Sequence, residues 1–158
     1  MLLACGGSSW DPHQYYDDLE FAGIAALDSV IKESDEVIAY NWNDHEYNPA
    51  NTQHHIVDAY GVFDKHTEDG HTLSKAQVIR LGELMNDTTH FGGYNSMCFI
   101  PHIAFVYYKK GNIIGQSNIC FMCSGIKSVP KSTGALSEKG IAAFEAFCEE
   151  LGLEIIKH

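Results

Sequence analysis

The sequence predicts an α+β fold in which an antiparallel sheet of about four strands carries helices on one face. Three observations support this prediction. Apolar residues recur at helical spacing in three segments, short β-prone segments occur in two pairs, and the members of a pair are neighbours along the chain. The expected order is therefore helix, two strands, helix, two strands, helix, which favours a sheet with helices packed on one side.

The first half of the chain is expected to contain a helix followed by two strands. Residues 10–34 contain Asp11-Pro12 near their start, a typical helix N-cap followed by Pro at the first helical position, and continue with apolar residues on one face. Residues 36–42 and 56–63 have the character of strands, and the polar stretch 43–55 between them is typical of a loop. We expect these two strands to pair in antiparallel orientation.

Two further helices are predicted. Residues 73–86 carry a buried stripe and can be capped by Thr72 or Ser74. A last helix opens at Ser137 and ends at Gly152. Its apolar stripe includes Cys148, which we interpret as a core residue. Residues 124–137 are expected to form a loop and residues 153–156 a short terminal strand.

Three of the five cysteines lie in the segment 97–125, which predicts a β-hairpin. Its strands are expected near 102–108 and 113–121, with a turn at 109–112. Cys98 precedes the first strand, and Cys120 and Cys123 stand at the end of the second. Because a hairpin brings the start of one strand beside the end of the other, we expect the three sulfurs at one end of the hairpin.

Four residues at this end form a candidate metal site, namely Cys98, His102, Cys120 and Cys123. Thiolate and neutral imidazole are the ligands that structural zinc prefers, so one zinc ion is a possible cofactor. A disulfide between Cys98 and Cys120 or Cys123 is a second interpretation. A redox dithiol is a third, although the residues after Cys123 predict a loop and not the helix that activates a thioredoxin-like thiol.

The bulk properties describe one domain and exclude some partners. The 158 residues are 45% hydrophobic and 20% charged, as is usual for a globular domain. A formal charge of −11 with only ten Lys and Arg argues against a nucleic-acid partner. No apolar run reaches the roughly twenty residues that a membrane span requires. The expected partner is an unidentified protein or small molecule.

The N-terminus resembles the end of a bacterial lipoprotein signal peptide. Leu2-Leu3-Ala4-Cys5 fits the lipobox of that family, and the following Gly6-Gly7-Ser8-Ser9 fits its small-residue tether. The basic and most of the apolar parts of such a signal are missing from this sequence, which indicates a truncated start. The resemblance implies Cys5 as the lipidation site, residues 1–9 as signal and tether, residues 10–158 as the domain, and a cell-envelope location with a lipid anchor as the membrane attachment.

A second resemblance covers the cysteine hairpin. The stretch 96–102 with Cys98, Pro101 and His102, and the later Cys120-Phe121-Met122-Cys123, resemble a group of uncharacterised small Bacteroidetes-type proteins, often lipoproteins. That group implies no activity. We therefore expect a binding or structural module of the envelope, with the four-residue cluster as a disulfide or zinc staple, rather than an enzyme. The alternative is a thiol-disulfide redox protein that uses Cys120 and Cys123.

Overall fold

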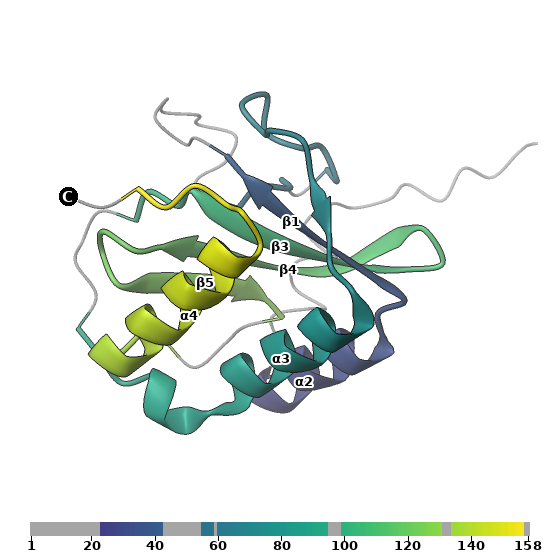
Figure 1. The fold of residues 1–158 in the computed structure, drawn as a ribbon. Helices are drawn as coiled ribbons and strands as arrows, with labels where there is room; N and C mark the ends of the chain where they lie inside the picture. The colour runs from purple at the N-terminus through teal and green to yellow at the C-terminus, as the bar shows by residue number, and fades with distance from the viewer. Residues whose placement is uncertain (1–22, 43–54, 59, 95–98, 131–133, 157–158) are drawn as a thin grey trace, which may run out of the picture.

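The computed structural model describes residues 23–42, 55–58, 60–94, 99–130 and 134–156. The elements follow in the order α2 (Gly23–Glu33), β1 (Glu36–Asn41), β2 (His71–Thr72), α3 (Lys75–Asn86), the short 3-10 helix η1 (Thr88–His90), β3 (Ile103–Lys109), β4 (Asn112–Cys120), β5 (Gly125–Val129) and α4 (Glu138–Glu150). The strands form one five-stranded sheet in the order β2-β1-β3-β4-β5, and every neighbouring pair is antiparallel (Figure 1). The predicted α+β class is thereby confirmed.

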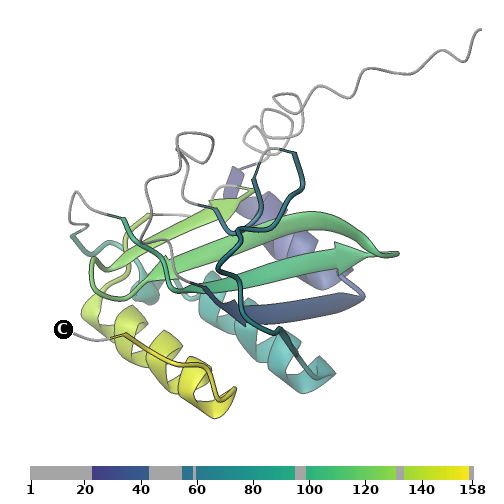
Figure 2. The ribbon, with the colours of Figure 1, turned by 90° about the horizontal axis from the view of Figure 1, so that it is seen from above.

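The three α-helices cover one face of the sheet (Figures 1 and 2). Strand residues pointing to this face alternate with residues pointing away, so that Ile103, Phe105 and Tyr107 join the helix-side core. The helices contribute Leu27, Ile31, Leu81, Leu84, Met85, Phe144, Phe147 and Cys148 to that core. Cys148 is fully buried there, as the helical stripe indicated.

On the face of the sheet opposite α2, α3 and α4, the segment 55–57 packs against the strands. Ile56 and Val57 pack with Trp42, Ala104 and Val106 in a second apolar cluster. Polar side chains of β4 hold the segment there. The Ile56 amide donates to Asn118 Oδ1 (2.9 Å), while Gln116 bonds both the amide and the carbonyl of Val57 (3.2 and 2.9 Å).

The predicted strand 56–63 is wrong. The only ladder contact described within it is a single bridge between Val57 and Phe63. Asp58 turns the chain back because its carboxylate accepts from the amides of Tyr60 (2.8 Å) and Val62 (2.9 Å). The second partner of β1 is instead β2, whose Thr72 pairs with Ile38.

Two C-terminal expectations also differ from the structure. The loop predicted for 124–137 contains β5, which pairs along β4 from Cys120 to Gln116. The terminal strand predicted for 153–156 does not form. Residues 153–156 are held by a side chain instead of by strand pairing. The Asn41 side chain donates to the Glu154 carbonyl (2.7 Å) and accepts from the Glu154 amide (2.9 Å).

The remaining local predictions agree with the structure where it describes them. Ser74 caps α3 in a capping box with Gln77, and Ser137 caps α4. The β3–β4 turn uses positive φ at Lys110 and Gly111 (51° and 77°). In the predicted helix 10–34, the structure describes α2 from residue 23 onward, and residues 10–22 lie outside the described part. None of the described helices combines the length and apolar character needed to cross a membrane.

Candidate cysteine site

The two sulfurs of the Cys-x-x-Cys sequence lie in the tight link between β4 and β5. Cys120 is the last residue of β4 and pairs with Gly125, the first residue of β5. Four residues therefore reverse the chain, and Ser124 takes a positive φ of 55° to close the turn. Cys120 is 1% and Cys123 4% exposed, whereas Met122 between them is 37% exposed. The turn thus presents its thiols inward and its methionine outward.

Hydrogen bonds give the two thiols unequal acidity. The thiol of Cys123 donates to the Cys120 carbonyl oxygen (3.7 Å) and interacts with the Cys120 sulfur. That side-chain interaction lowers the pKa of Cys120, and the backbone amides of Ile100, Cys123 and Met122 lower it further against the effect of burial. The same interaction, together with burial, raises the pKa of Cys123. The pKa of the Cys120 thiol therefore lies below that of the Cys123 thiol.

His102 lies across the sheet from Cys120. Ile103 pairs with Ile119 in the β3–β4 ladder, and the His102 amide donates to the Ile119 carbonyl (3.1 Å). One step further along this antiparallel register, His102 stands opposite Cys120. Opposed residues of such a ladder project to the same face of the sheet, so the imidazole and the sulfur share a face. His102 is buried, with 4% of its surface exposed.

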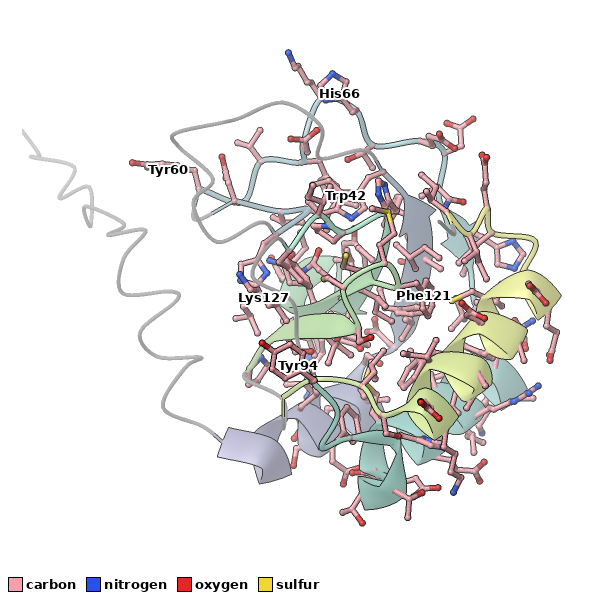
Figure 3. The ribbon with its side chains drawn as sticks, turned by 90° about the vertical axis from the view of Figure 1, so that its left-hand side faces the viewer. Trp42, Tyr60, His66, Tyr94, Phe121 and Lys127 are labelled. Carbon is pink, nitrogen blue, oxygen red and sulfur yellow. The ribbon has the colours of Figure 1, made fainter. Side chains whose placement is uncertain are left out.

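Phe99 packs directly on the cysteine pair. With Cys120 and Cys123 it forms a small apolar cluster separate from both larger ones. Its ring also lies against Gly125 and under the ammonium group of Lys127, which is 4.7 Å from the ring centroid. In Figure 3, Lys127 lies on the side of the sheet away from α4, whereas Phe121 lies toward α4 and belongs to the helix-side core.

The structure brings together part of the predicted four-residue set. Cys120 and Cys123 are in contact, and His102 stands opposite Cys120. Cys98, like the predicted lipidation site Cys5, lies outside the described residues. Within the described part of the chain, no three His, Cys, Asp or Glu side chains gather closely enough to hold a metal ion. Phe99 follows Cys98 directly in the sequence and packs in one buried cluster with Cys120 and Cys123.

Several residues of this region were missed by reasoning from the sequence. His55 Nδ1 lies 2.9 Å from the Asn118 side-chain nitrogen, which places a second buried histidine on the face that carries His102. The signal that could have found it is the polar run Gln116-Ser117-Asn118 inside a β-prone segment. Polar residues in a buried strand need partners, which predicts a segment packed on that strand.

Comparisons of the chain with protein-family models, with curated proteins and with solved structures give no match.

Proposed function

We propose that this chain is a non-enzymatic binding or structural module of the bacterial cell envelope, and that its cysteine site is a staple built around a zinc ion. The observation that carries the proposal is the convergence of two buried sulfurs in a Cys-x-x-Cys turn, with backbone amides directed at Cys120. Amide donors offset the charge of a metal-bound thiolate, and Cys-x-x-Cys turns supply half of many zinc sites.

The other half of the zinc site is proposed from His102 and Cys98. His102 shares a face with Cys120, and Phe99, which follows Cys98, packs in one buried cluster with both cysteines. The three thiolates and the imidazole make a Cys₃His set, which suits tetrahedral zinc. Metal binding would then be coupled to local folding of the site, as is common for structural zinc.

A redox role for Cys120 and Cys123 is the second candidate, and the lowered pKa of Cys120 favours it. Two features oppose it. Both sulfurs are buried, so a protein disulfide cannot reach them without rearrangement, and the turn leads into strand β5 rather than into a helix. A structural site therefore fits the geometry better than a catalytic thiol.

The test is intact mass measured under native and denaturing conditions, with thiol alkylation before and after reduction. A native mass that exceeds the denatured mass by one zinc, with thiols released by chelator, supports the metal staple. A denatured mass lower by about two hydrogens indicates the disulfide form of the staple. Fast-reacting thiols with neither feature overturn the staple in favour of the redox protein.

The matched variants are Cys120→Ser and Cys148→Ala. Cys148 is a thiol of the same chain that lies in the helix-side core, away from the proposed ligands. Cys120→Ser should abolish zinc retention, and Cys148→Ala should keep it. Equal retention in both variants would contradict the assignment. The envelope location is tested separately by fractionating cells that express the native gene with and without Cys5→Ser, where loss of membrane association is the expected result.

A further inference from the structure

We propose that the Phe99 ring, held in place by Lys127, is a cover that controls how fast ions and thiol reagents reach Cys120 and Cys123. The cover acts on the site of the proposed zinc staple, and its role in zinc exchange rests on that proposal.

The buried apolar cluster that contains the two cysteines is small. Phe99, Cys120 and Cys123 are its buried members, and Phe99 is 7% exposed. Neither large core cluster includes the two sulfurs. Among the described residues, Phe99 is therefore the buried apolar side chain that packs with the two cysteines. Its removal would take away this apolar contact.

The Phe99 ring packs against β5 at Gly125. A Cβ added to Gly125 would lie 2.6 Å from Phe99 Cδ2 and 3.0 Å from Cys123 Sγ. Real Cβ atoms do not approach other heavy atoms so closely, so the ring fits over the sulfurs because residue 125 has no side chain. Gly125 thus lets an aromatic ring lie flat against the backbone beside the pair.

Lys127 of β5 also contacts the Phe99 ring. Lys127 follows Gly125 by two residues on β5, so both project to the same face of the sheet. Its ammonium lies 4.7 Å from the Phe99 centroid, within the range of a cation–π contact. The ring is held between a strand backbone and a cation, and both contacts come from β5.

Phe99 can leave this seat without breaking the sheet. It lies outside the named strands, three residues before His102. Displacing the ring costs, among its contacts, the packing with the two cysteines and the Lys127 contact. The β3–β4 ladder begins at Ile103 and does not include Phe99. Local openings of this kind need less free energy than global unfolding. Access to the sulfurs is therefore set by the ring and not by unfolding of the domain.

The test is site-resolved alkylation of the reduced, metal-free protein with iodoacetamide, read by peptide mass spectrometry. Phe99→Ala should raise the alkylation rates of Cys120 and Cys123 on the order of tenfold. Lys127→Gln, a milder change at the sheet surface, should raise them about twofold, the factor that corresponds to an exposed cation–π contact.

Cys148 serves as the internal standard for unfolding. It is fully buried in the helix-side core, and burial is the first of the causes that raise its pKa to about 12. If the cover is correct, Cys120 and Cys123 react faster in the variants while Cys148 does not change. Unchanged rates at the pair, or rates that rise in parallel at all three cysteines, would overturn the cover.

Zinc exchange separates the failure of this inference from the failure of the zinc staple. Zinc-loaded parent and Phe99→Ala are mixed with an excess of a colorimetric chelator. Faster release from the variant supports the cover, and equal release rates overturn it. A parent that takes up no zinc overturns the zinc staple. The alkylation rates of the metal-free protein then decide by themselves whether Phe99 covers the two cysteines.

Discussion

Asn118 connects two segments that lie 62 residues apart in the chain. It is fully buried on β4, where its carbonyl oxygen accepts from the Ile56 amide and its NH₂ group contacts His55. A buried backbone amide requires a partner, and here a side chain supplies what a neighbouring strand would normally supply. Together with Gln116, Asn118 therefore does for the segment 55–57 what a ladder does elsewhere in the sheet.

Replacing Asn118 by Ala is expected to lower the free energy of unfolding by about 2–3 kcal/mol, because it removes the hydrogen-bond acceptor of the buried Ile56 amide and the contact between Asn118 and the His55 ring. Urea unfolding followed by tryptophan fluorescence measures the change. Asn112→Ala on the same strand is the control, since Asn112 is exposed and should change stability by no more than about 0.5 kcal/mol. A similar loss in both variants would contradict this role of Asn118.

At the scale of elements, Gly82 in α3 and Gly140 in α4 have opposite roles. Gly140 in the first turn of α4 lies against the backbone of His90, so that an added Cβ would overlap the His90 carbonyl oxygen. Gly82 in the middle of α3 has more room, and its added Cβ would lie 3.6 Å from Ile31 Cγ2, an ordinary contact. The first glycine allows α4 to dock on η1, and the second is a weak point in a helix.

Gly140→Ala is therefore expected to destabilise the domain by about 1–3 kcal/mol, because α4 must move away from η1. Gly82→Ala is expected to stabilise it by about 0.5–1 kcal/mol through helix propensity. The same substitution in two helices thus has opposite signs, and thermal unfolding of both variants measures it. Shifts of the same sign would show that the close approach at His90 does not control the docking of α4.

At the scale of the whole molecule, Asp87 ties together the end of α3, η1 and α4. Its carboxylate accepts from the amide and hydroxyl of Thr89 (2.9 and 2.5 Å) and from Lys139 (3.2 Å). The Thr89 hydroxyl, the Thr89 amide and then Lys139 lower the pKa of Asp87 from 3.8 to about 2. Three elements that pack on the sheet therefore share one ionised group.

This pKa predicts a pH dependence of stability. Because the folded pKa of Asp87 lies below the unfolded value, its contribution is present above about pH 4 and is lost as the pH falls toward about 2. Asp87→Asn should be less stable than the parent at pH 5, and the difference should shrink between about pH 4 and 2. Urea midpoints across this range provide the measurement, with exposed Glu68→Gln as control. A difference that stays constant with pH would contradict the prediction.

Patterns local in the sequence were sufficient for much of the fold. The hairpin of β3 and β4, the helices α3 and α4 and the caps Ser74 and Ser137 were predicted because helical or strand periodicity and turn residues act over a few positions. Strand β5 was missed because Ser, Lys and Gly dominate its composition, and its pairing with β4 depends on a neighbour in space. Residues 56–63 were assigned to a strand because their β-branched and aromatic residues outweighed the turn formed by Asp58.

The sequence by itself determined the α+β class and the gathering of Cys120 and Cys123 at the end of a strand, since a separation of three residues leaves little freedom. Only the tertiary structure decided that both sulfurs are buried, that His102 stands opposite Cys120, and that Phe99 packs with the pair and contacts Lys127. These contacts join segments that are far apart in the chain. Their geometry depends on sheet register and on packing space, which the order of residues in one segment does not encode.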